Sequence, residues 1–250
     1  MPVHDLSGTT AVVTGASRGF GRATSLALAA RGAHVVGVAR NEALLDELSK
    51  EIGAGFTVEV ADVADPSVAT RLLTKHRPRT IVLNAGATPN AAPLRDQDWE
   101  NFSANWQTDV RHVFNFAREA LGLPLEPGSV VVSLSSGAAL RGSPLSGGYA
   151  GAKAAIRFIS SAAAWDAGRT GAGIRFVALL PQLTPATDLG RTYTEIYAEA
   201  EGLTVTEYVE RGGGALGADQ VGEGIAALVT DDAYDAPAYL ITHGGLAPVG

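Results

Sequence analysis

The chain has 250 residues, of which 46% are hydrophobic, so it can form one sizeable core, and a single domain spanning residues 1–250 is expected. Its formal net charge of −7 argues against nucleic-acid binding, because such modules usually display clustered lysine and arginine. It has no cysteine, which excludes disulfides and thiolate chemistry, and no apolar run of ~18 residues, so a cytoplasmic protein without a membrane partner is expected.

Short runs rich in β-branched residues alternate with longer helical patterns along the chain. The expected strands cover residues 10–14, 34–39, 56–60, 80–84, 129–135, 174–180 and 238–241. The expected helices cover residues 20–31, 41–52, 66–76, 98–121, 149–168 and 218–230. This alternation predicts an α/β fold with a doubly wound parallel sheet of about seven strands and helices on both faces.

Residues 182–217 do not fit this alternation. They follow the sixth expected strand, and ligands of doubly wound sheets bind beyond the carboxyl ends of the strands. The segment is therefore interpreted as a substrate lid, with Gly212-Gly213-Gly214 as its hinge. A surface insertion is the alternative interpretation.

A glycine-rich turn joins the first expected strand to the first helix. Its sequence is Thr14-Gly15-Ala16-Ser17-Arg18-Gly19-Phe20-Gly21. Backbone N–H groups at the start of a helix can hold a pyrophosphate, and glycines permit the close approach. The turn therefore predicts a dinucleotide site, while a tight strand-to-helix packing turn is the alternative.

The end of the second expected strand carries the residue that distinguishes the two nicotinamide dinucleotides. An NAD site usually places an acidic residue there to bind the ribose 2′-hydroxyl, but this chain has Arg40. Arg40, Arg18 and the Ser17 hydroxyl could converge on a 2′-phosphate, which predicts NADP rather than NAD. The alternative is that Arg40 caps the neighbouring helix or faces solvent.

Two further strand ends carry residues suited to the adenosine half of a dinucleotide. Asp62 could accept a hydrogen bond from the adenine amino group, and Asn84-Ala85-Gly86 is expected beneath the adenosine ribose. Taken singly, both could equally be ordinary strand-to-turn residues, where Asx and glycine are common.

The candidate catalytic residues lie in the second half of the chain. Tyr149 and Lys153 stand one helical turn apart on the same helix face, and a nearby cation favours the ionised form of a phenol. Ser136 ends the fifth expected strand, and a strand, loop and helix of this length can bring its hydroxyl beside Tyr149. The three side chains predict a proton-transfer site.

Together these motifs resemble the short-chain dehydrogenase/reductase family over nearly the whole chain, from Thr9 to about Gly245. The matching pieces are Thr14-Gly15-x-x-x-Gly19-x-Gly21, Asp62-Val63, Asn84-Ala85-Gly86, Ser136, Tyr149-x-x-x-Lys153 and Pro181. The resemblance implies a Rossmann-like fold and hydride transfer between a nicotinamide and a carbonyl or alcohol.

The resemblance also implies a role for each matching residue. Tyr149 would be the general acid in reduction, Ser136 would hydrogen-bond the substrate oxygen, and Lys153 would hold the nicotinamide ribose. Cofactor contacts are further implied for the residues Phe20, Val63, Pro181 and Thr184. A homodimer or homotetramer is implied as well, with the helices at 98–121 and 149–168 at the interface.

The chain departs from the family pattern at two positions. The fourth catalytic residue of the family, an asparagine, falls on Asp109, with Asn105 and Asn101 as alternative alignments. At Asp109 a water relay to Lys153 could still run through the backbone carbonyl. Gln182 stands where the family usually has glycine and is expected to alter the turn beside the nicotinamide.

These observations predict an NADP(H)-dependent ketone or aldehyde reductase. The alternative is a non-catalytic NADP-binding sensor, which would be expected to lose Tyr149 or Lys153. A small apolar carbonyl or alcohol substrate is predicted from the candidate pocket residues Leu140, Leu145, Leu183, Leu189, Tyr193, Ile196 and Tyr197. The histidines are scattered without ligand spacing, so no metal site is expected.

Overall fold

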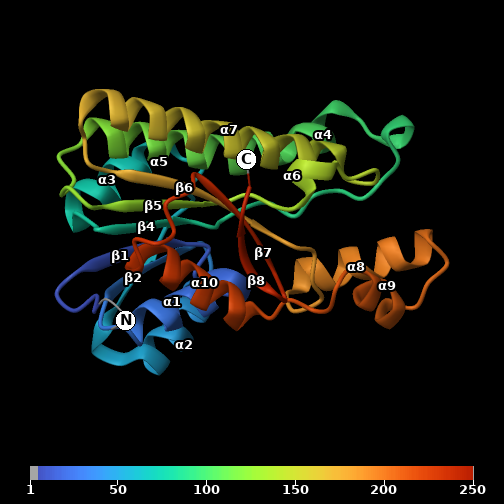
Figure 1. Ribbon diagram of the computed structural model, residues 1–250, viewed down its shortest axis with the longest axis horizontal. Coiled ribbons are helices and arrows are strands. Elements are labelled where there is room, and N and C mark those ends of the chain that lie inside the picture. The colour runs from blue at the N-terminus through green and yellow to red at the C-terminus, as the bar shows by residue number, and fades with distance from the viewer. Residues whose placement is uncertain (1–4, 250) are drawn as a thin grey trace.

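The computed structural model describes residues 5–249, which form one sheet with helices on both faces (Figure 1). The eight strands lie in the order β3-β2-β1-β4-β5-β6-β7-β8. Their bounds are β1 Thr10–Thr14, β2 His34–Ala39, β3 Phe56–Val60, β4 Thr80–Leu83, β5 Val130–Leu134, β6 Arg175–Pro181, β7 Ala238–Thr242 and β8 Gly245–Pro248. All neighbours pair in parallel except β7 and β8, so the expected doubly wound parallel sheet is confirmed and gains one antiparallel edge strand.

The helices follow the expected alternation and add elements in the loops. Their bounds are α1 Gly19–Ala29, α2 Glu42–Ile52, α3 Pro66–His76, α4 Trp99–Asn105, α5 Arg111–Gly122, α6 Ala138–Arg141, α7 Gly147–Thr170, α8 Asp188–Ala200, α9 Val205–Arg211 and α10 Ala218–Thr230. Short 3-10 turns cover Gly53–Gly55 and Leu94–Asp96. The single helix expected over 98–121 is instead α4 and α5 joined by a π-helical turn, Trp106–Val110.

The apolar strands bury both of their faces. In β1, Ala11 and Val13 join a core that also contains side chains of α1, α2 and α10, whereas Val12 joins a second core with α3, α5 and α7. A parallel sheet covered on both faces requires such continuous apolar strands. Figure 1 shows the two helical layers, with α7 and α5 on one side of the sheet and α1 and α10 on the other.

The strand order reverses beside β1, and this reversal positions the candidate site. From β1 the chain runs outward through β2 and β3, then returns to β4 on the other side of β1. The Thr14 hydroxyl at the end of β1 accepts hydrogen bonds from the backbone N–H groups of Asn84 (2.9 Å) and Ala85 (3.2 Å), which follow β4. Ligands of doubly wound sheets bind at this kind of crevice.

Residues 182–217 contribute α8 and α9, which extend beyond the carboxyl end of β6 (Figure 1). Side chains at the start of this segment form hydrogen bonds with backbone carbonyls at its C-terminal end. Gln182 Nε2 donates to the carbonyls of Gly212 (2.9 Å) and Gly214 (3.2 Å), and the Thr184 hydroxyl donates to Leu216 O (2.5 Å). The segment thus has a helical body and a base closed by hydrogen bonds.

Among residues 5–249, no helix combines the length and apolar character needed to cross a bilayer.

Candidate active site

A cleft of about 1540 Å³ lies at the carboxyl ends of the central strands. Nearly all residues predicted for the site line this cleft. They are Gly15, Ser17, Arg18, Gly19, Phe20, Arg40, Asp62, Val63, Asn84, Ala85, Gly86, Asp109, Ser136, Tyr149, Lys153, Pro181 and Thr184. The remaining predicted residue, Gly21, is buried behind the glycine-rich turn. The structure therefore brings nearly the whole predicted set to one cleft.

The glycine-rich turn has the geometry that a pyrophosphate requires. Gly15 has φ +66°, and a Cβ on Gly21 would lie 2.2 Å from the Gly15 carbonyl oxygen, so helix α1 can approach the turn only with glycine there. Helix α1 begins without a side-chain cap and without an acidic residue in its first turn, whereas Asn41 caps α2. Within residues 5–249 no side chain caps the first N–H groups of α1, so they are available to an anion, which fits a dinucleotide phosphate.

Two guanidinium groups flank the adenosine end of the cleft. Arg18 and Arg40 are both exposed, and neither has a hydrogen-bond or ion-pair partner within residues 5–249. Arg40 does not cap the neighbouring helix, because Asn41 Oδ1 accepts the hydrogen bond from Leu44 N at 3.1 Å. Both side chains are available to a ligand phosphate.

The strand-end residues Asn84 and Asp62 use part of their polar groups inside the protein. Asn84 Nδ2 donates to the carbonyls of Thr14 (3.0 Å) and Gly15 (3.2 Å), so this side chain braces the glycine-rich turn. Asp62 Oδ1 accepts from Ala64 N at 3.0 Å and shapes the turn after β3. The Asn84 backbone N–H is also used inside the protein, because it donates to the Thr14 hydroxyl at 2.9 Å.

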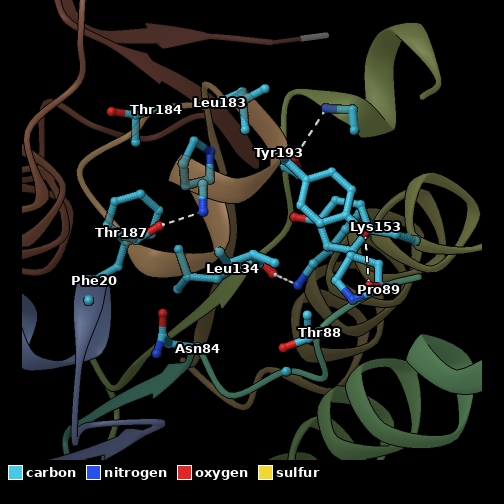
Figure 2. A pocket seen from close by; sticks show the side chains of 18 of the residues that line it. Phe20, Asn84, Thr88, Pro89, Leu134, Lys153, Leu183, Thr184, Thr187 and Tyr193 are labelled. Carbon is cyan, nitrogen blue, oxygen red and sulfur yellow. Dashed lines mark hydrogen bonds between the residues drawn. The ribbon is translucent and has the colours of Figure 1, made fainter. Parts of the chain in front are cut away.

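The candidate catalytic residues converge from β5 and α7. Lys153 Nζ donates to Leu134 O at 3.1 Å (Figure 2). The same nitrogen lies 5.5 Å from the centre of the Tyr149 ring. The Ser135 hydroxyl donates to Lys153 O at 2.7 Å and so fixes α7 against the end of β5. Ser136, the next residue in the chain, lines the same cleft, and its hydroxyl accepts a hydrogen bond from Ala138 N at 3.2 Å.

Lys153 is almost fully buried and is charge-paired. Burial alone lowers the pKa of its ammonium, but the charges of Asp109 and Tyr149 raise that pKa above the ordinary value. Asp109 Oδ2 lies 3.2 Å from Lys153 Nζ. Lys153 therefore stays protonated beside Tyr149 across the physiological pH range.

Asp109 reaches the site because the helix is irregular around it. It sits in the π-helical turn between α4 and α5, and such turns often mark functional positions. Of the two alternative asparagines, Asn101 is exposed and bonded to Asp98, while Asn105 Nδ2 donates to Ala87 O at 2.8 Å. The sequence predicted a water relay from the backbone carbonyl of Asp109 to Lys153. In the structure the carboxylate of Asp109 contacts Lys153 directly.

Tyrosines of α8 and α9 form the wall of the cleft opposite Lys153. The Tyr193 hydroxyl donates to Pro89 O at 2.8 Å (Figure 2), and burial raises the pKa of Tyr193 to about 12. The Tyr197 hydroxyl bonds Ser143, and the Tyr197 ring is nearly parallel to that of Tyr208 with centres 6.5 Å apart. Because the Tyr193 and Tyr197 hydroxyls are bonded to protein groups, these side chains present mainly apolar ring surface to the cleft.

Most of the predicted pocket residues line the cleft. The lining includes Leu140, Leu183, Leu189, Tyr193 and Tyr197. The prediction was wrong for Leu145 and Ile196. The Leu145 backbone is bonded to the Tyr197 hydroxyl and to Ala92 N, and Ile196 points to another side of α8 than Tyr197, because successive helical residues are rotated by about 100°.

The geometry agrees with a family match over most of the chain. Residues 9–197 match the family model described as short chain dehydrogenase. The chain belongs to this short-chain dehydrogenase/reductase family. It has a mostly parallel Rossmann-like sheet, and it is an NAD(P)-dependent oxidoreductase.

Named relatives of the family align over much or nearly all of the chain. 3-Oxoacyl-(acyl-carrier-protein) reductase FabG of Escherichia coli (strain K12) is 29% identical over 97% of this chain and 98% of that protein. L-Xylulose reductase of Mesocricetus auratus is 34% identical over 75% of this chain and 76% of that protein. The solved 3-ketoacyl-(acyl-carrier-protein) reductase from Brucella melitensis, complexed with NADH, has a TM-score of 0.81 at 25% identity and covers 95% of this chain and 98% of its own.

Proposed function

We propose that this short-chain dehydrogenase/reductase is an NADP(H)-dependent reductase of ketones or aldehydes in which Tyr149 donates the proton. The observation that carries the proposal is the buried ammonium of Lys153, 5.5 Å from the Tyr149 ring centre in a cleft that Ser136 also lines. Burying a charge is costly, and a non-catalytic sensor would have no need to keep one beside a phenol. This favours the enzyme over the sensor.

Different residues of the cleft bind the cofactor and act on the substrate. The N-terminus of α1 and the glycine-rich turn hold the pyrophosphate, Lys153 holds the nicotinamide ribose, and the bound dinucleotide supplies the hydride. Tyr149 gives its proton to the carbonyl oxygen of the substrate, while the Ser136 hydroxyl hydrogen-bonds the same oxygen. Because the lid tyrosines present apolar surface, the substrate is a small apolar carbonyl compound.

The direct test is the oxidation of NADPH, followed at 340 nm, against a panel of apolar ketones and aldehydes with a charged keto acid as comparison. Turnover with an apolar carbonyl is expected. Binding of NADPH without consumption on any compound would instead support the sensor.

NADPH is expected to bind at least ~30-fold more tightly than NADH, or about 2 kcal/mol for one net guanidinium–phosphate contact. The physical reason is that Arg18 and Arg40 face the cleft without protein partners among residues 5–249. Fluorescence titration with both dinucleotides measures the ratio. Equal affinities would contradict the assignment of the two arginines.

The variant Arg40→Asp isolates the contribution of one side chain. The new carboxylate repels the 2′-phosphate, so the Kd for NADPH should rise far more than the Kd for NADH. Arg95→Asp is the matched control, because Arg95 is exposed and lies outside the cleft. The same Kd values for Arg40→Asp as for the wild type would mean that Arg40 points to solvent.

We also propose that two copies of the chain associate through the outer face of α5 and α7. Both helices lie side by side on one face of the sheet (Figure 1). Large apolar side chains are exposed on these helices and on the adjoining turn and α4, namely Trp99, Trp106, Phe114, Phe158 and Trp165. A surface of this kind is typical of a subunit interface.

Phe158→Asp is expected to convert the oligomer to monomers, because a buried unpaired carboxylate opposes association. Light scattering after size-exclusion chromatography gives the mass. Val60→Asp, on the edge strand β3, removes another exposed apolar side chain and should leave the mass unchanged. A wild-type protein that is already monomeric would refute the interface.

A further inference from the structure

Asp109 uses its two carboxylate oxygens for different partners. Oδ1 accepts a hydrogen bond from Ala87 N at 2.8 Å, and Oδ2 lies 3.2 Å from Lys153 Nζ. The carboxylate is 1% exposed and the lysine side chain 7% exposed, so the ion pair is shielded from water. Asp109 therefore links the loop after β4 to the lysine of the candidate site.

Asn105 supports the same loop and the same carboxylate. An amide side chain offers a donor and an acceptor, whereas a carboxylate only accepts. The backbone N–H and C=O of Ala87 both pair with side chains of the helix around the π-helical turn: the N–H donates to Asp109 Oδ1 at 2.8 Å, and the C=O accepts from Asn105 Nδ2 at 2.8 Å. Asn105 Nδ2 also lies 3.4 Å from both carboxylate oxygens of Asp109, so it helps to hold the carboxylate while Oδ2 pairs with Lys153.

The charges around Lys153 come from few groups. Lys153 faces the phenol of Tyr149 on α7, donates to the carbonyl of Leu134 on β5, and pairs with Asp109 on the π-helical turn. His112 on α5 is neutral, because burial lowers the pKa of its ring to about 3. Tyr193, which lies near Tyr149 from α8, is neutral as well, since burial raises its pKa to about 12.

The carboxylate of Asp109 changes what Tyr149 experiences. A lone ammonium at this position would favour the ionised phenol strongly. A close ammonium–carboxylate pair has no net charge, and its field at the phenol is weaker than that of the ammonium alone.

We propose that Asp109 is a positioning residue whose carboxylate holds Lys153 and compensates its charge, and so sets the pH range in which Tyr149 exchanges its proton. The proposal rests on the proposed function only for its catalytic meaning. The charge compensation itself is a property of the protein without substrate.

The ionisation of Tyr149 in the full-length protein tests the proposal without any turnover. The absorbance of tyrosinate at 295 nm is titrated against pH for each protein and for its Tyr149→Phe counterpart, and the difference isolates Tyr149. Asp109→Asn leaves the ammonium uncompensated, so the pH midpoint of this difference is expected to fall by about one unit or more. Asp166→Asn, at the exposed far end of α7, is the matched control and should leave the midpoint in place.

A double variant distinguishes compensation from a merely structural role. Lys153→Ala leaves an unpaired carboxylate near the phenol and should raise the midpoint. Asp109→Asn/Lys153→Ala removes both charges and should return the midpoint to about the wild-type value. The double variant leaves no unpaired buried charge. If Asp109→Asn alone does not fold, the pH midpoints of the double variant and of Lys153→Ala are compared instead.

Two results would overturn the inference. The first is a wild-type midpoint in Asp109→Asn, and the second is the same midpoint in the double variant and in Lys153→Ala. In turnover, the pH at which alcohol oxidation begins should fall with Asp109→Asn in step with the titration. A shifted titration without turnover on any substrate would support the compensation and refute the proposed reductase, whereas normal turnover with an unshifted titration would refute the compensation alone.

Discussion

Tyr149→Phe is expected to lower the turnover number by several powers of ten while NADPH affinity stays nearly unchanged. General acid catalysis by a positioned side chain contributes roughly 10²–10⁴-fold, and this substitution removes the acidic hydroxyl while keeping the ring. The hydroxyl acts on the substrate oxygen and barely on the dinucleotide. Steady-state assays at 340 nm give the turnover number, and fluorescence titration gives the Kd for NADPH.

Tyr234→Phe is the matched control for this substitution, since Tyr234 lies outside the cleft. It should retain wild-type turnover. Retention of more than a tenth of the activity by Tyr149→Phe would show that another group donates the proton. Asp109 would then be the first candidate, because it is the other acidic residue beside Lys153 in the lining of the cleft.

Lys153→Ala should differ from Tyr149→Phe in its effect on cofactor binding. Both variants lose turnover, but loss of the ammonium also removes the expected contact to the nicotinamide ribose, so the Kd for NADPH should rise. Alcohol oxidation should begin at a higher pH, because the group that favours the ionised phenol is gone. The variant should also unfold at a lower temperature, since removing one partner of a buried ion pair typically costs about 3–5 kcal/mol.

Titration with NADPH, a pH profile of alcohol oxidation and thermal unfolding together test these effects. Lys50→Ala serves as the control, because this exposed lysine near the end of α2 lies outside the cleft. An unchanged Kd for NADPH in Lys153→Ala would contradict the ribose contact while leaving the role of Tyr149 intact.

Much of the site could be predicted because its residues stand at strand ends. In a doubly wound sheet the carboxyl ends of the parallel strands meet at one edge, so Gly15 after β1, Arg40 after β2 and Ser136 after β5 share a cleft once the strands are recognised. The prediction therefore needed only the local strand and helix patterns and the rule that strands joined by helices form a parallel sheet. The particular role of each side chain stays a proposal.

Strand β8 could not be predicted by the same means. Its sequence Gly245-Leu246-Ala247-Pro248 has no β-branched residue and no alternation. It becomes a strand by pairing with β7 at the edge of the sheet, and its proline is tolerated because no further strand follows there. Tertiary context rather than local propensity decides such a strand.

The two helices within residues 182–217 begin with local capping signals in the sequence. Thr187 caps α8, and Thr204 and Glu207 form a reciprocal capping box at the start of α9. A search for caps would have found both starts. In contrast, the hydrogen bonds from Gln182 to the end of the same segment join residues far apart in the sequence and have no local signature.

The ion pair of Asp109 with Lys153 was beyond sequence reasoning for a physical reason. Its geometry depends on the π-helical turn, which shifts the side-chain positions by one residue relative to a regular helix. The pattern of residues 98–121 shows only a continuous helix. The pairing of the Ala87 N–H with Asp109 and of the Ala87 C=O with Asn105 also depends on this turn.

The central claim is that this enzyme transfers a hydride from a nicotinamide to a carbonyl carbon while Tyr149 protonates the oxygen. The most direct measurement uses NADPH doubly deuterated at C4 of the nicotinamide and the best carbonyl substrate of the panel, with the product analysed by mass spectrometry. The account predicts that the wild-type enzyme forms an alcohol carrying one deuterium. It predicts that Tyr149→Phe forms almost no alcohol. An alcohol without deuterium, or equal amounts of labelled alcohol from both proteins, would contradict it.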